Sequence, residues 1–244
     1  MSWIAVLLIG VAVADLAHAV RPVPVVDECV GAAAAVLVGL AAGLTEPVDV
    51  AALVTIAAVV ILWGQTVTRG FGRGPAWLPL LVIAVALAGA VAVSGKAAPV
   101  GGLVADWLDT VGVPVLEGVD PTRFLLLAAV FLVQLSTGNV VVRLVLTATG
   151  TMNPSRRERP AHDELPLKGG RLLGPMERVF ILGLGLAGQL TAASIVIAAK
   201  GLLRFPELQS KEDQARIHQV TEYFLVGSFA SWLLALGSLV LLAP

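Results

Sequence analysis

The sequence predicts an all-α, polytopic membrane protein with seven transmembrane helices. Long apolar runs alternate with short polar breaks along the 244 residues, and a run of about 20 apolar residues can cross a bilayer as a helix. Hydrophobic residues make up 57% of the chain and charged residues only 14%, whereas about 25% of the residues of a soluble domain are charged. The mean hydropathy is +0.91. We therefore expect hydrocarbon, rather than water, around most of the protein.

Each predicted span begins and ends where the composition changes. Residues 2–20 form the first, and we expect a retained helix rather than a signal peptide, because no basic residue precedes the apolar run and no convincing cleavage pattern follows it. This helix ends at the proline-containing turn 21–24, since proline cannot continue a helix. Turns rich in proline, glycine and charge separate the others. We place these spans at residues 25–44, 48–67, 77–94, 122–148, 175–203 and 221–243.

Two longer connections lie between the spans. Residues 95–121 contain Trp107, and we expect a short interfacial helix at residues 103–110 because tryptophan favours the depth of the headgroups. Trp63 is expected near an interface for the same reason. Residues 151–171 form the most polar stretch. We find no internal repeat and no soluble appendage, so residues 1–244 are predicted to form one integral membrane domain.

Lysine and arginine in short loops indicate which side of the membrane each loop occupies. The odd-numbered loops carry slightly more of these cations than the even-numbered loops. The sequence therefore predicts a cell-membrane protein with its N-terminus outside and its C-terminus inside.

Composition excludes several classes of function. The net charge is −1, so the chain has no basic surface for nucleic acid. Cys29 is alone, which excludes an intrachain disulfide and a cysteine-based metal cage. His18 lies beside Asp15 on one helix face, but it also lies next to a turn where polar groups are common. We therefore predict no metal site, and no motif points to a cofactor.

Ionisable residues inside the spans are costly in lipid and are the first candidates for function. On a continuous helix over residues 175–203, Arg178, Gln189 and Lys200 share one face, and the two cations lie about 33 Å apart. This stripe could bind an anion. The alternative is that the cations reach the headgroups from the helix ends, while small residues pack against neighbouring helices.

The chain that enters this helix carries a second anion signal. Glycines and the cations Lys168 and Arg171 precede the helix N-terminus, where backbone N–H groups can hold a phosphate or carboxylate. Glu177 lies in the first turn, where the helix dipole favours an acid. The alternative is an ordinary capped helix with interfacial cations.

The neighbouring spans supply further polar residues. Asn139 and Arg143 share a face of the span at residues 122–148 and either bind a ligand or bond to other helices. Glu222 lies in the first turn of the last span, and Glu177 or Glu222 could pair with Arg143. Asp15 is unusual because it lies deeper than the turn that ends its helix, where a buried carboxyl could accept a proton.

The C-terminal third of the chain, about residues 168–242, resembles a bacterial multi-pass membrane family known only as a domain of unknown function. The resemblance lies in the order and spacing of Lys168-Gly169-Gly170-Arg171, Gly174, Glu177-Arg178, Gln189, Ala198-Ala199-Lys200, Arg204-Phe205 and Glu222-Tyr223-Phe224-Leu225-x-Gly227. It implies no reaction, substrate or cofactor. It does point to Arg171, Glu177, Arg178, Gln189, Lys200, Arg204 and Glu222.

Three functions are compatible with these residues. The leading hypothesis is binding or permeation of an anionic lipid headgroup or small anionic solute through a polar seam of the last three spans. The seam would contain Arg171, Arg178, Gln189, Lys200, Arg204, Asn139 and Arg143. The second is an intramembrane enzyme acting on an isoprenoid or lipid, with Asp15, Glu177 or Glu222 as general acid or base. The third is a scaffold or accessory subunit.

These hypotheses predict different structures. Carboxyls that converge on one apolar pocket favour the enzyme, and a continuous wet path favours permeation. A seam filled by internal pairs favours the scaffold. Membrane lipids are the partners that the sequence predicts, and it names neither the ligand nor the oligomeric state.

Overall fold

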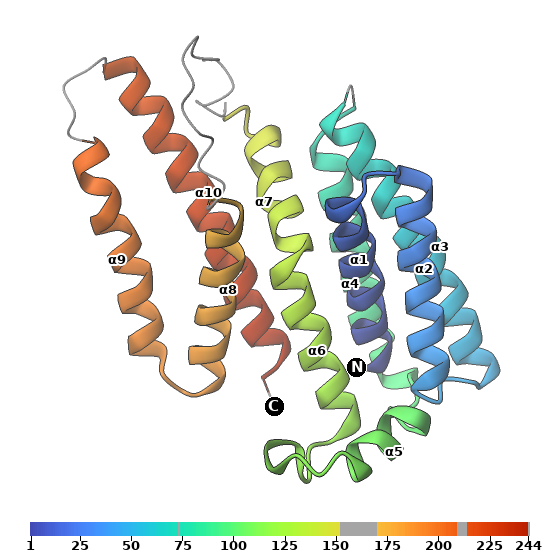
Figure 1. The fold of residues 1–244 in the computed structure, drawn as a ribbon. Helices are drawn as coiled ribbons and strands as arrows, with labels where there is room; N and C mark the ends of the chain where they lie inside the picture. Colours follow the sequence, from blue (N-terminus) through green and yellow to red (C-terminus); the bar gives the residue numbers. More distant parts are fainter. Residues whose placement is uncertain (73, 152–169, 209–213, 244) are drawn as a thin grey trace. The chain divides into compact units, whose positions relative to one another are not determined.

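The structure, a computed structural model, describes residues 1–72, 74–151, 170–208 and 214–243. Side chains within these ranges are described except at residues 24, 170–172, 200–201, 203–208 and 214–220. The described residues form helices and no strands (Figure 1). They divide into two compact units, Met1–Val140 and Val141–Ala243, and each is described by itself. The prediction of a single domain stays a prediction.

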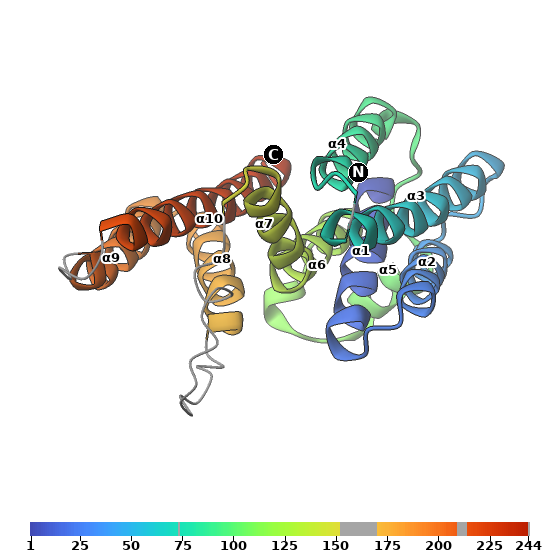
Figure 2. The ribbon, with the colours of Figure 1, turned by 90° about the horizontal axis from the view of Figure 1, so that it is seen from above.

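In unit 1, helix α1 lies at the centre. The helices α2, α3, α4 and α6 surround it (Figure 2). Their bounds are Ser2–Val20 for α1, Pro24–Ala41 for α2, Pro47–Phe71 for α3, Trp77–Ala92 for α4 and Pro121–Leu135 for α6. Most side chains of α1 are buried, as expected for a helix that is apolar around its whole circumference. The first predicted span is therefore confirmed as a helix with the predicted bounds.

Proline determines where several of these helices begin. Pro24, Pro47 and Pro121 lie at the first helical position of α2, α3 and α6, where the N–H group that proline lacks would have no partner within the helix. Helix α6 also has a side-chain cap, because Asp120 accepts a hydrogen bond from the backbone N–H of Arg123 at 2.8 Å.

The connection between α4 and α6 contains the predicted short helix, here α5 (Gly102–Thr110). Two 3-10 turns flank it, η1 (Ser94–Lys96) and η2 (Pro114–Leu116). Gly101 donates its backbone N–H to Ala42 at 2.8 Å, so α5 begins against the turn that ends α2. Gly102 has φ 55, a left-handed conformation that glycine adopts without strain.

The predicted span 122–148 is not one straight helix. It consists of α6 and α7 (Thr137–Ala148), which are bent by 49° at Ser136. The Ser136 hydroxyl donates to the carbonyl of Ala12 on α1 at 2.9 Å, and it also lies 3.1 Å from the carbonyl of Leu132. A serine that bonds to backbone carbonyls in this way bends a helix, which explains the break.

The predicted span 175–203 is also divided, and the expectation of one continuous helix is wrong. The chain forms α8 (Gly170–Leu186) and α9 (Leu190–Leu208), which are joined by a turn at Gly188 with φ 72. Residues with a side chain rarely adopt this conformation. The two helices lie side by side, and α10 (Gln214–Leu241) packs mainly against α8 (Figure 1).

Three helical stretches of the described chain are long and apolar enough to cross a membrane: Ser2–Val20, Pro47–Phe71 and Thr221–Leu241. The number rises to four if the bent pair α6 and α7 makes one crossing. The structure therefore supports a helical membrane protein, and it does not confirm seven crossings.

Candidate functional site: a buried carboxyl at a broken helix

A carboxyl group lies within the helices of unit 1. Asp15 is on α1, about 7.5 Å along the axis from the last residue of the helix, and it is 9% exposed. The indole Nε1 of Trp63, on α3, donates to this carboxylate at 3.2 Å from Oδ1 and 3.3 Å from Oδ2. Trp63 is completely buried among the helices, and its expected position near a membrane interface stays a prediction. A carboxylate charge at this depth is costly unless something neutralises it.

The break between α6 and α7 faces this carboxyl. Thr137, the first residue of α7, lies beside Asp15, and its buried hydroxyl has no partner that meets hydrogen-bond geometry. Ser136 bonds to Ala12, three residues before Asp15, which holds the break against α1. Gln134 is completely buried just before the break. Thr137 thus lies beside Asp15, and Ser136 contacts the same helix three residues earlier.

A histidine and an aspartate, His18 and Asp27, form a titratable pair between Asp15 and the α1–α2 turn. His18 lies three residues after Asp15 on the same face of α1. Its Nδ1 is 2.8 Å from Oδ2 of Asp27, which also accepts the backbone N–H of Val23 at 2.9 Å. The His18 side chain is half exposed. His18 and Asp27, which can both carry a proton, therefore lie between Asp15 and the exposed turn.

Glu28, another buried acid of unit 1, contacts residues of α3 other than Trp63, the indole partner of Asp15. Glu28 on α2 packs against Gly64 of α3 and bonds to the side chain of Gln65. Within the described residues, no three side chains of histidine, cysteine, aspartate or glutamate come close enough to hold a metal ion.

A similar indole–carboxyl pair lies at the other end of α1. Trp3 donates to Asp49 Oδ1 at 2.7 Å, and the backbone N–H of Ala98 lies 3.4 Å from the same oxygen. Asp49 is 2% exposed, but it lies in the first turn of α3, where the helix dipole stabilises an acid. Asp15 lacks this stabilisation, because it lies near the C-terminal end of α1. The two pairs therefore differ in how well they tolerate a negative charge.

Unit 2 has a polar centre of its own. Arg178 on α8 is 1% exposed, and its guanidinium donates to the hydroxyl of Ser231 on α10 at 3.2 Å. Beside it, Glu177 accepts a hydrogen bond from the Trp232 indole at 2.8 Å. Ser231 lies midway along the stretch Thr221–Leu241, about 15 Å from either end. Arg178 therefore contacts the middle of α10. The snorkelling alternative instead expects this side chain to extend toward a helix end.

The predicted anion stripe does not form. Gln189 is exposed in the turn after α8, so it shares no helix face with Arg178. The side chains of Arg171, Lys200 and Arg204 lie outside the described residues. On α7, Asn139 is half-buried and Arg143 is exposed.

The two carboxyls of unit 2 whose side chains are described, Glu177 and Glu222, do not converge either. Glu222 is exposed near the start of the apolar part of α10. It lies about 15 Å along the helix from Trp232, the partner of Glu177. The enzyme hypothesis, in which Asp15, Glu177 or Glu222 acts as general acid or base, therefore has no shared pocket of carboxyls among the described residues of unit 2.

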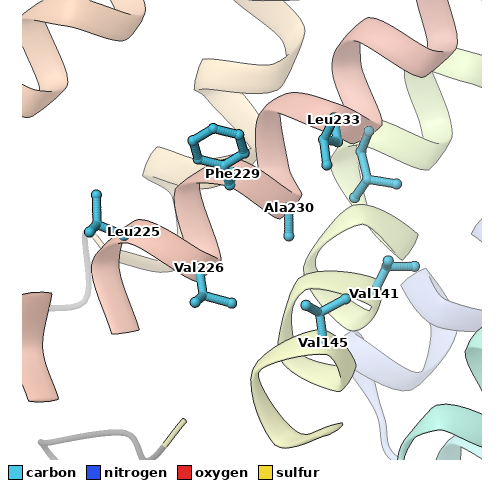
Figure 3. A pocket seen from close by; sticks show the side chains of 8 residues that line it. Val141, Val145, Leu225, Val226, Phe229, Ala230 and Leu233 are labelled. Carbon is cyan, nitrogen blue, oxygen red and sulfur yellow. The ribbon is translucent and has the colours of Figure 1, made fainter. Parts of the chain in front are cut away.

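An apolar groove of about 530 Å³ runs between α7 and α10 in unit 2 (Figure 3). Its lining consists of aliphatic side chains and one phenylalanine, contributed by Val141, Val145, Leu225, Val226, Phe229, Ala230, Leu233 and Leu234. Such a surface suits hydrocarbon and holds no ion. The groove therefore provides no wet path to Arg178.

Sequence reasoning found Asp15 from its depth and missed Trp63 and Thr137, its neighbours from α3 and α7.

No known family model matches this chain, and no curated protein or solved structure is significantly similar to it. The resemblance of residues 168–242 to an uncharacterised membrane family stays a prediction, and the function has to be argued from the geometry.

Proposed function

We propose that this membrane protein takes up and releases a proton at Asp15 and that this step serves permeation. The observation that carries the proposal is a buried carboxyl placed beside a helix break, with Trp63 and Thr137 against it. Ionisable groups inside membrane bundles commonly mark proton relays. Broken helices inside such bundles commonly mark binding sites.

The local chemistry favours a proton over other ligands. Binding converts the carboxylate to a neutral carboxylic acid, which removes the cost of a charge at this depth. The indole of Trp63 is a hydrogen-bond donor only. Its bond to Asp15 can persist in both protonation states, because the carboxylate and the neutral carboxylic acid each keep an oxygen that accepts. His18 and Asp27 extend from this site to the exposed turn. They supply the groups through which the proton would enter.

Proton flux into liposomes tests the proposal. Purified wild-type protein, Asp15→Asn and the matched control Asp49→Asn are reconstituted, and an internal pH dye follows acidification after an external acid pulse. We expect flux from wild type and Asp49→Asn, and for Asp15→Asn only the leak of empty liposomes. Equal flux from all three proteins, or flux that requires sodium in place of choline, contradicts the proposal.

A second function is favoured by Arg178, a buried cation that contacts the middle of the candidate span Thr221–Leu241. We propose for this site the binding of an anionic headgroup or small anionic solute, since a buried guanidinium attracts a carboxylate or phosphate. Its test is thermal stabilisation by phosphate and by phosphatidylglycerol, compared in wild type, Arg178→Gln and the exposed control Arg143→Gln. Loss of stability without any change in ligand response supports the scaffold alternative, in which Arg178 and Glu177 only hold α8 and α10 together.

Because of the turn at Gly188, we propose a different orientation for the C-terminus from the one that the sequence predicts. If residues 175–203 fold back as a hairpin and the other predicted spans each cross once, the C-terminus lies on the same outer side as the N-terminus. The cations in the second half of α9 and after it then lie inside with those of the odd-numbered loops. Of the 16 lysines and arginines, only Lys96 and Arg123 would face outside. This arrangement satisfies the positive-inside rule better than seven single crossings do.

A further inference from the structure

The α1–α2 turn of unit 1 borders a second pocket, with a volume of about 620 Å³. Its walls are apolar side chains of α1 and α2, and its polar lining residues are Arg21 and Asp27. The apolar residues are Val13, Leu16, Ala17, Val20, Val23 and Val26. Helix α1 is a candidate membrane span that ends here, so the pocket lies where acyl chains meet headgroups.

Exposure shows that the apolar wall continues onto the surface. Val20 is 82% exposed and Val26 is 54% exposed. An apolar surface of this kind beside the end of a span is stable in contact with lipid and costly in contact with water. The occupant of the pocket therefore has a hydrocarbon part that lies along α1.

The two charged residues of the pocket define the other part of the occupant. Arg21 is exposed, and its guanidinium suits a phosphate group. Asp27 is 6% exposed and holds His18 and the Val23 amide through the single oxygen Oδ2. Its Oδ1 is thus the oxygen that can accept from a ligand. One cation and one carboxylate complement a headgroup that carries a phosphate and an ammonium.

We propose that this pocket binds a zwitterionic phospholipid with a primary ammonium, such as phosphatidylethanolamine. The phosphate lies on Arg21, the ammonium donates to Asp27, and an acyl chain covers Val13, Leu16 and Val20. Phosphatidylcholine has no N–H donor for Asp27. Phosphatidylglycerol has no cation, so the carboxylate of Asp27 opposes its charge. The pocket therefore selects a lipid by its headgroup.

Native mass spectrometry of the detergent-solubilised full chain tests the proposal. The protein is titrated separately with dioleoyl phosphatidylethanolamine, phosphatidylcholine and phosphatidylglycerol, and the fraction with bound lipid is measured. We expect the ethanolamine lipid to bind wild type about tenfold more tightly than the other two, the ratio that one additional charge-assisted hydrogen bond supports. This ranking requires no variant. Equal or tighter binding of the choline or glycerol lipid overturns the proposal.

Two variants assign the headgroup contacts. Arg21→Gln is expected to weaken binding of the ethanolamine lipid about tenfold, and Asp27→Asn is expected to reduce it to the level of the choline lipid. The control is Arg123→Gln, which removes an exposed arginine near the carboxyl that caps α6 and should leave binding unchanged. If Arg21→Gln and Arg123→Gln bind this lipid equally, the assignment of the phosphate to Arg21 is wrong.

Discussion

The indole Nε1 of Trp63 lies 3.2 Å from Oδ1 and 3.3 Å from Oδ2 of Asp15, and the two residues, on different helices, are 48 positions apart in the chain. This contact joins α1 to α3 inside unit 1. It also places a neutral donor, rather than a cation, against a carboxyl in the helix bundle. A neutral donor steadies the carboxyl without fixing its charge, so the group can bind a proton.

Replacing Trp63 with phenylalanine is expected to destabilise the protein by about 1–3 kcal/mol, because the buried carboxyl loses its donor. Chemical unfolding in detergent measures the change. The control is Trp77→Phe, since Trp77 is 56% exposed and should tolerate the change. In an Asp15→Asn background the cost of Trp63→Phe should fall, because the charge that needed the donor is gone. An undiminished cost means that Trp63 acts only by packing.

Arg178→Met alone is expected to cost about 3–5 kcal/mol, because Glu177 then remains as a buried charge beside it. The double variant Arg178→Met/Glu177→Gln should recover most of this loss, since it removes both charges. Thermal unfolding of the two variants measures the difference. Equal losses in the single and double variants would mean that Glu177 and Arg178 do not compensate one another.

The turn at Gly188 should not tolerate a β-branched residue. Its φ of 72 lies in the left-handed region, so Gly188→Val is expected to destabilise the α8–α9 connection by about 1–3 kcal/mol. The matched control is Gly183→Ala in α8, where an added Cβ meets nothing within 4 Å. If both variants unfold at the wild-type temperature, the turn is not required for stability.

The hairpin also predicts the location of the termini. In a Cys29→Ser background, which removes the exposed free thiol, single cysteines introduced near the two ends should both react with an impermeant maleimide added to intact cells. Seven single crossings predict instead that only the N-terminal cysteine reacts. Labelling of the C-terminal cysteine solely after the membrane is opened would refute the hairpin topology.

The sequence predicts α1 well because an apolar run ends there at charge and proline, and it predicts α5 from the interfacial preference of Trp107. It does not predict the breaks at Ser136 and Gly188, because both lie inside apolar runs. The first break depends on a hydroxyl that bonds to a different helix, and the second places Gln189 in a turn instead of on a helix face. Asp15 could be found from its depth alone. Trp63 could not, since tryptophan is expected at the membrane surface.

The protonation of Asp15 itself is the most direct test of the account. Infrared difference spectra of wild type and Asp15→Asn, recorded while the pH is lowered, report the carbonyl stretch of a carboxylic acid. We predict a band in wild type and in Asp49→Asn that is lost in Asp15→Asn. The chain has 17 acidic residues, and the other carboxyls contribute bands that the proteins share, so the difference between the spectra is decisive. Identical pH-dependent spectra of wild type and Asp15→Asn contradict proton uptake at this carboxyl.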